Sequence, residues 1–152
     1  MKYQVSGAAS AGNERRDSLK ICLLTYRGNP TCGGQGVYIN YLSRALRDLG
    51  HEVDVVSGPP YPELAADIAL HKLPGLDLYN PEHLFKPERF RDLAYPINQY
   101  EFLSMSLGGF PEPLTFGLRT FQLFRAKRPA YDVVHDTQCL SYGLLGLPRI
   151  RF

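Results

Sequence analysis

The sequence has few cysteines, little net charge and no long apolar run, and each of these absences excludes a class of protein. The cysteines number three, an odd count without the spacing of metal ligands, which argues against a disulfide framework and against a metal site. The formal net charge is +2, and no basic run is interleaved with aromatic residues as in a nucleic-acid groove. No apolar stretch approaches the ~18–20 residues that span a bilayer. These features favour a cytoplasmic protein without a nucleic-acid partner.

The N-terminal segment lacks the order of a signal peptide. Its polar and charged stretch, residues 13–17, follows the small residues, and no hydrophobic segment is present. We expect residues 1–18 to be a disordered leader. Residues 19–152 are enough for one domain with a hydrophobic core, and a composition of 44% hydrophobic and 21% charged residues is typical of globular proteins.

The stretch from Leu19 to Ser57 predicts a strand, a glycine-rich loop, a helix and a second strand. Residues 19–26 are almost wholly apolar, as in a strand buried on both faces of a parallel sheet. A helical pattern begins at Val37, ends at Gly50 and leads into a strand over 52–57. The predicted buried stripe of this helix is Tyr38, Tyr41, Leu42, Ala45, Leu46 and Leu49, with Asn40, Ser43, Arg44, Arg47 and Asp48 facing away.

The rest of the chain continues this alternation. We expect an edge or near-edge strand over 68–73, helices over 96–107 and 112–127, and a strand over 131–135 with Val133 and Val134 buried. Asp136 and Thr137 can cap a further helix that Pro148 stops; its residues are Cys139, Leu140, Tyr142, Leu144, Leu145 and Leu147. The alternation predicts an α/β fold, a Rossmann-like doubly wound parallel sheet with right-handed crossovers.

The helix over 112–127 is both aromatic and basic, and this has two interpretations. Leu114, Leu118, Phe121 and Phe124 recur at helical spacing, and the basic residues at its rim are Arg119, Arg125, Lys127 and Arg128. Either the helix covers the sheet with its basic side chains at the edge, or it forms a peripheral contact with an anionic membrane.

The glycine-rich loop indicates a phosphate site. Its glycines are Gly33, Gly34 and Gly36. Neither a dinucleotide fingerprint nor a P-loop fits, because Ile39 stands where the third glycine belongs and no Gly-Lys-Ser/Thr follows. The remaining alternatives are a phosphate cradle of backbone N–H groups at a helix N-terminus and a tight connection without a ligand.

The other candidate is His135, at the carboxyl end of a predicted parallel strand. Ligands of open α/β sheets bind at such ends, although neighbouring backbone can also satisfy a histidine there. Neither His71 nor His83 has a constellation of partners around it. The carboxylates Asp92, Glu101 and Glu112 are too scattered along the chain to suggest a pair.

Three ordered motifs, T-C-G-G-Q-G-V-Y-I, G-H-E-V-D-V-V and Y-D-V-V-H-D-T-Q, resemble the N-terminal, acceptor-side domain of a family 4 retaining glycosyltransferase with the GT-B architecture. The resemblance implies hexosyl transfer from a nucleotide-diphosphate sugar to an acceptor, with no cofactor and no catalytic metal. It implies that the catalytic residue His135 lines the cleft and contacts the transferred sugar. It also implies donor-phosphate or acceptor contacts from Gly33, Gly34, Gln35, Gly36 and Asp136.

The donor-binding domain of that family carries two glutamates spaced E-x(7)-E, and this sequence has no such pair. We therefore expect a truncated half of a GT-B fold that is inactive alone and that a C-terminal-domain chain could complete. The alternative is a non-catalytic Rossmann-like module that binds a phosphorylated ligand or a partner; a nucleotide-dependent oxidoreductase is disfavoured by the glycine pattern.

Overall fold

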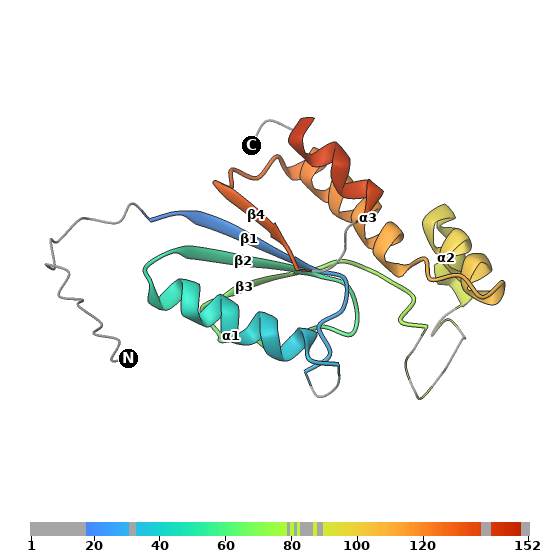
Figure 1. The fold of residues 1–152 in the computed structure, drawn as a ribbon. Coiled ribbons are helices and arrows are strands. Elements are labelled where there is room, and N and C mark those ends of the chain that lie inside the picture. The colour runs from blue at the N-terminus through green and yellow to red at the C-terminus, as the bar shows by residue number, and fades with distance from the viewer. Residues whose placement is uncertain are drawn as a thin grey trace, which may run out of the picture.

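A four-stranded parallel sheet with helices on both faces forms the body of the protein in a computed structural model (Figure 1), which describes residues 18–30, 33–78, 80, 82, 87, 90–137 and 141–149. The strands are β1 (Lys20–Thr25), β2 (Glu52–Ser57), β3 (Ala69–Lys72) and β4 (Val133–Asp136). Their order is β3-β2-β1-β4, so β1 is central and the predicted doubly wound parallel sheet is confirmed. The predicted leader, apart from Ser18, lies outside the described residues, as do His83, Cys139 and Leu140.

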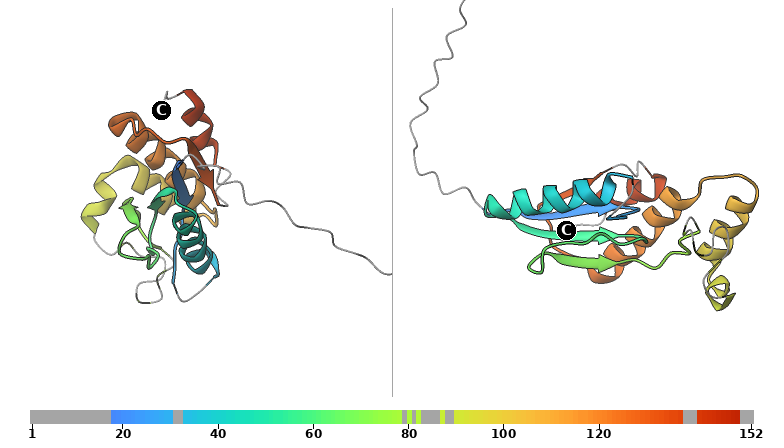
Figure 2. Two further views of the ribbon diagram at one scale, coloured as in Figure 1. Left: turned by 90° about the vertical axis from the view of Figure 1, so that its left-hand side faces the viewer. Right: turned by 90° about the horizontal axis from the view of Figure 1, so that it is seen from below.

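Alternate residues of the central strand face two separate hydrophobic clusters. Ile21 and Leu23 pack with residues of β2 and of helix α1 (Gln35–Asp48). Cys22 and Leu24 pack on the opposite face with Phe116 and Phe124 of helix α3 (Glu112–Lys127). Figure 2 shows the two helices on opposite sides of the sheet. This arrangement explains the nearly continuous apolar run of β1, since both of its faces are covered.

The buried stripe of α1 differs from the predicted one. Ile39 and Ser43 are fully buried, whereas Tyr38 is 50% and Tyr41 70% exposed, and Ala45 and Leu49 are exposed too. The helix begins at Gln35, two residues before the predicted start. Gly36 lies against the loop after β1, and this contact turns positions 36, 39 and 43 towards the sheet.

The predicted helix over 112–127 has the bounds of α3, but its buried face includes polar residues. Phe116 and Phe124 are in the core, Leu118 is 38% exposed, and Arg119, predicted at the rim, is buried. The buried aromatic side chains agree with a helix that covers the sheet, and contact with a membrane stays a prediction. After β4 the chain forms a 3-10 helix, η2 (Tyr142–Arg149), against α3, where an α-helix was predicted.

Strand β4 is covered on one face only. Val134 packs against the cluster under α3, but Val133, predicted to be buried, is 41% exposed. Its register partner Ile21 faces α1, and α1 lies over β1 and β2. Exposure of Val133 therefore follows from the position of β4 beyond the cover of α1.

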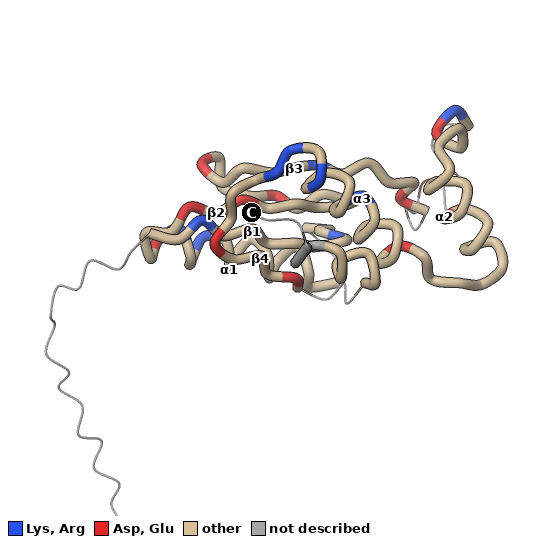
Figure 3. Tube along the Cα trace, turned by 90° about the horizontal axis from the view of Figure 1, so that it is seen from above, with Lys and Arg blue, Asp and Glu red and all other residues tan. Residues whose placement is uncertain are grey.

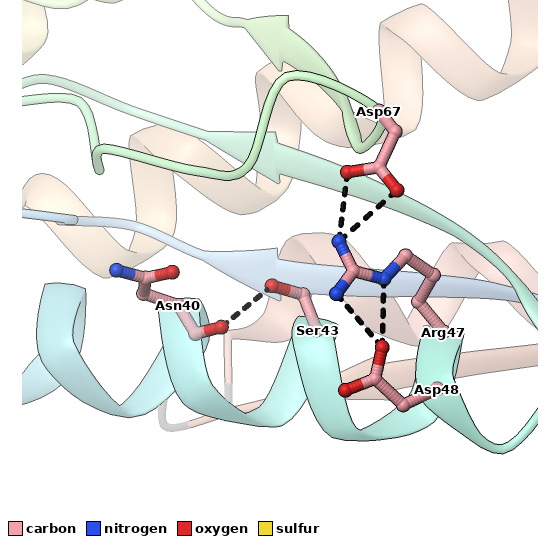
Figure 4. A network of polar contacts seen from close by, with 5 residues as sticks. All are labelled: Asn40, Ser43, Arg47, Asp48 and Asp67. Atoms are coloured by element: carbon pink, nitrogen blue, oxygen red, sulfur yellow. Dashed lines mark hydrogen bonds and ion pairs between the residues drawn. The ribbon is translucent and has the colours of Figure 1, made fainter.

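The C-terminus of α1 is fixed by backbone and ionic contacts. Gly50 has φ +93°, and the N–H groups of Gly50 and His51 donate to the carbonyls of Arg47 and Leu46, as in a Schellman motif. The guanidinium of Arg47 lies between the carboxylates of Asp48 and Asp67 (Figure 4), at 2.7 and 2.8 Å. These contacts hold the helix to the segment that precedes β3.

Two helical segments complete the architecture, a 3-10 helix η1 (Phe90–Ala94) and the helix α2 (Pro96–Ser106), whose bounds agree with the prediction for 96–107. Lys and Arg residues occur at several separate places along the described trace (Figure 3). Within the described residues, no helix has the length and apolar character needed to cross a membrane.

Candidate functional site

The carboxyl ends of the four strands form the edge of the sheet at which ligands bind in open α/β proteins. The loop from Tyr26 leaves β1 at this edge and leads to the N-terminus of α1. The neighbouring strand β4 ends there too, since Leu24 of β1 is paired with Asp136. The sheet thus brings the glycine-rich loop and the end of β4 to the same edge.

Gly33 and Gly34 are required by backbone conformation. Their φ angles are +85° and +74°, and a Cβ added at either position meets no atom within 4 Å. Gly34 is the N-cap of α1, whose first turn has no side-chain cap and no acidic residue. The amide of Tyr38 donates to the Gly34 carbonyl, while the N–H groups of Gly36 and Val37 have no acceptor within the described chain. This end of the helix can therefore accept an anion.

Gly36 packs closely against the loop after β1, and its predicted contact with a ligand stays a prediction. A Cβ on Gly36 would lie 2.2 Å from the Asn29 carbonyl oxygen and 2.3 Å from that of Gly28. Gly28 in turn donates its N–H to the Pro60 carbonyl at 2.7 Å. The glycines thus pack the loop after β1 between the loop after β2 and the first turn of α1.

His135 lies in β4 with an exposed side chain. Its register partner is Leu23, which places the imidazole on the α1 face of the sheet, beside the part that α1 leaves uncovered. Asp136 is half-buried on the opposite face, paired with Leu24. The side chains of His135 and Asp136 therefore lie on opposite faces of the sheet. A cleft shared by His135 and the glycine-rich loop stays a prediction.

The pairing of β4 with β1 extends to Thr137. Its backbone N–H and its hydroxyl both donate to the Leu24 carbonyl, at 3.1 and 2.8 Å. Both groups of Thr137 thus complete the pairing of β4 with β1. Residues 138–140 lie outside the described residues, so the predicted capping role of Asp136 and Thr137 stays a prediction.

A buried polar network missed by the sequence interpretation lies beneath the same edge of the sheet. Arg119 of α3 donates from Nη2 to Glu101 of α2 and to the Asn98 Oδ1 at 2.6 Å. All three side chains are buried. The spacing of Glu101 and Glu112 in the sequence did not suggest that they meet. They line one small cavity with a volume of about 10 Å³, together with Arg119 and Asp77. Helices α2 and α3 bring them together.

Glu112 begins α3 and faces Arg27, which follows β1. The Arg27 Nε lies 3.2 Å from Glu112 Oε2, and its Nη2 donates to Oε1 at 3.4 Å. Burial raises the pKa of the Glu112 carboxyl to about 7, with Glu101 and Asp77 adding to the rise and Arg27 opposing it. A carboxyl group at the positive end of a helix and beside a guanidinium fixes α3 to the loop after β1.

His71, for which the sequence suggested no partners, lies in a group of polar side chains. Its Nε2 lies 3.3 Å from Asp54 Oδ2, and the Tyr131 hydroxyl donates to the same oxygen at 2.6 Å. Burial, then this hydrogen bond, raises the pKa of the Tyr131 hydroxyl. Burial raises the pKa of the nearby Cys22 thiol to about 12, so Cys22 is no nucleophile at neutral pH.

No group of at least three His, Cys, Asp or Glu residues in the described ranges could hold a metal ion. The site that the described residues do form consists of an uncapped helix N-terminus and an exposed histidine at one edge of the sheet. The helix N-terminus at such an edge can bind an anion.

Two comparisons with known proteins place this geometry in context. The sequence model of the family described as "Glycosyl transferase 4-like domain" matches residues 33–151. A mannosyltransferase of Mycolicibacterium hassiacum (strain DSM 44199 / CIP 105218 / JCM 12690 / 3849), named "MMP alpha-(1->4)-mannosyltransferase", is 46% identical over 135 residues. That alignment covers 88% of this chain and 33% of the relative, so the chain spans about a third of the length of the relative it matches.

Proposed function

Because this chain belongs to the glycosyl transferase 4-like domain family, we propose that it contributes the acceptor-side half of a retaining glycosyltransferase that moves a hexose from a nucleotide-diphosphate sugar. The observation that carries the proposal is the family match over residues 33–151, which includes both the glycine-rich loop and β4. The name of the Mycolicibacterium relative supports mannose as the transferred hexose and an α-(1→4) linkage as the product.

In the proposed reaction, the N-terminus of α1 faces the phosphates of the donor. The amides of Gly36 and Val37 and the positive end of the helix dipole would stabilise the diphosphate as it leaves with the bonding electrons. The exposed imidazole of His135 would contact the transferred sugar. The nucleotide pocket would come from sequence outside these 152 residues, either in the same protein or in a complementing chain.

An exposed helix N-terminus gives an anion only ~0.3–1 kcal/mol, a several-fold gain in affinity. We therefore propose that the 152-residue chain alone does not turn over a sugar donor, with or without metal. We keep the predicted cytoplasmic location and the peripheral membrane contact as proposals. In the alternative, a non-catalytic phosphate-binding module, Gly33 to Gly36 would bind phosphate as well, but His135 would have no functional role.

The test is a chimaera in which this chain replaces the matching third of the Mycolicibacterium hassiacum enzyme. The chimaera, its His135→Ala variant and a His51→Ala control are assayed for transfer of labelled mannose from GDP-mannose to an α-(1→4)-linked mannose oligosaccharide. We expect His135→Ala to lower kcat about 100-fold and His51→Ala, at the far end of α1, to retain activity. Equal rates for all three would refute the role of His135, and a folded but inactive chimaera would refute the proposed function.

A further inference from the structure

An ion pair connects the N-terminus of α3 to the chain that follows β1. Glu112 is the first residue of α3 and is buried, and Arg27, which comes after the end of β1, is half-buried. Two nitrogens of the guanidinium face the two carboxylate oxygens, with Nε at 3.2 Å from Oε2 and Nη2 at 3.4 Å from Oε1. This two-point contact fixes the orientation of the guanidinium as well as its distance from the carboxylate.

The backbone at Arg27 is also held from a second direction. Its carbonyl accepts a hydrogen bond from the hydroxyl of Thr25 at 2.6 Å, and the next amide, that of Gly28, donates to the Pro60 carbonyl at 2.7 Å. A Cβ on Gly28 would lie 2.3 Å from Pro62 Cδ, so the chain passes directly against the loop after β2. The segment that begins at Arg27 is therefore fixed both to α3 and to the loop after β2.

The first turn of α1 packs on this same segment. Gly36 lies so close to the carbonyl oxygens of Gly28 and Asn29 that an added Cβ would be 2.3 and 2.2 Å from them. Because backbone touches backbone here, no flexible side chain can absorb a displacement, and close-packed groups transmit it. A shift of the segment after β1 would therefore move Gly36 and Val37, whose amides face the donor phosphates in the proposed reaction.

The strength of the ion pair depends on whether Glu112 is ionised. The titratable groups that face its carboxyl group from the surrounding described elements are Tyr26, Arg27, Asp77, Glu101 and Arg119. Burial raises the pKa of Glu112 to about 7, the two arginines lower the pKa, and the two carboxylates raise it. At pH 8 the carboxylate is mostly ionised and attracts the guanidinium, whereas at pH 6 it is mostly protonated and that attraction is lost.

We propose that Arg27 and Glu112 are positioning residues for the donor phosphates: their ion pair sets the place of the segment after β1 and, through Gly36, the direction of the first amides of α1. The inference rests on the proposed function and adds to it two residues that act through the loop. One of them belongs to α3, the helix on the opposite face of the sheet from α1. Donor binding thus depends on the packing of both helices.

The test is an NMR titration of the 152-residue chain with GDP at pH 8, in which the amides of the first turn of α1 report on the site. Three variants change the ion pair: Arg27→Met, Arg27→Lys and Glu112→Gln. Two matched controls each remove an arginine from another ion pair, Arg47→Met at the opposite end of α1 and Arg119→Met between α2 and α3. Binding is measured at a temperature at which every variant is folded.

We expect Arg27→Met and Glu112→Gln each to weaken GDP binding roughly two- to fivefold, the range that a helix N-terminus contributes. The double variant should bind no more weakly, because both changes remove one contact, and Arg27→Lys should fall between, since a lysine keeps the charge without the two-point contact. Both controls should bind GDP as the unchanged chain does. Removal of a negative charge would by itself strengthen binding of an anion, so weaker binding by Glu112→Gln is specific to positioning.

A second titration at pH 6 tests the same point without a change in folding. There Glu112 is mostly protonated, so Glu112→Gln should bind GDP as the unchanged chain does. The inference is overturned if Glu112→Gln binds GDP at pH 8 as tightly as the unchanged chain or more tightly, if its effect is the same at pH 6, or if the two controls weaken binding as much as Arg27→Met.

The chimaera separates failure of this inference from failure of the proposed function, and it decides the matter if the 152-residue chain binds GDP too weakly to titrate. In the chimaera we expect Arg27→Met and Glu112→Gln to lower kcat/KM for GDP-mannose about tenfold and to leave the acceptor KM within about twofold. If the chimaera transfers mannose and both variants leave kcat/KM for GDP-mannose unchanged, the ion pair positions nothing and the proposed function stands. If the chimaera folds and transfers nothing, the proposed function fails.

Discussion

Replacement of Arg119 by methionine should destabilise the protein more than most single substitutions, because it leaves a buried carboxylate without its partner. Glu101 is 2% exposed, and its ion pair with Arg119 is screened by little water. Removal of one member of a buried ion pair costs about 3–5 kcal/mol. For a chain of this length each kcal/mol lowers Tm by about 2–4 °C, so Arg119→Met should lower Tm by roughly 6–20 °C.

The measurement is urea unfolding followed by circular dichroism, with thermal unfolding beside it. Arg125→Met, at an exposed position of the same helix, is the matched control and should change stability by less than about 0.5 kcal/mol. The double variant Arg119→Met/Glu101→Leu should recover most of the loss, since apolar replacement of both partners is often close to neutral. A loss below about 1 kcal/mol for Arg119→Met, or a double variant no more stable than the single one, contradicts this reasoning.

Other predictions concern the glycine-rich loop and Glu112. Gly34→Val places a β-branched residue at φ +74°, a strained backbone conformation even in open space, so we expect it both to lower Tm and to weaken GDP binding; a Tm and an affinity equal to those of the unchanged chain would refute this. Gly36→Ala puts a methyl group 2.2 Å from the Asn29 carbonyl oxygen and should lower Tm, and a Tm equal to that of the unchanged chain argues against the packing described. The pKa of Glu112 is raised to about 7 by burial, so the folded state holds a proton that the unfolded state has released. Stability should therefore fall by on the order of 2 kcal/mol as pH rises from about 4.5 to 7, and Glu112→Gln should flatten this slope in urea unfolding at several pH values.

Backbone architecture could be predicted from the sequence because its signals are local. The apolar run of β1, the glycine at position 50 and the proline that begins α2 each specify an element within a few residues. The parallel order with β1 in the centre then follows from right-handed crossovers. Family membership also rests on ordered local motifs.

The faces of the helices and the buried polar network could not be predicted in this way. Tyr38 and Tyr41 are apolar enough to join a buried stripe, and only the contact of Gly36 with the Asn29 carbonyl decides the rotation of α1. Arg119 and Glu101 are separated by 18 residues and resemble solvated side chains until α2 and α3 pack.

The initial rate of mannose transfer by the chimaera tests the central claim most directly, when compared with two reference proteins. These are the unchanged Mycolicibacterium enzyme and the same enzyme with the matching third deleted. If this chain supplies the acceptor-side half, the chimaera should transfer mannose with retention of the α configuration, while the deleted enzyme and the 152-residue chain alone should transfer none. Transfer by the deleted enzyme at the rate of the chimaera, or a product of inverted configuration, would contradict the account.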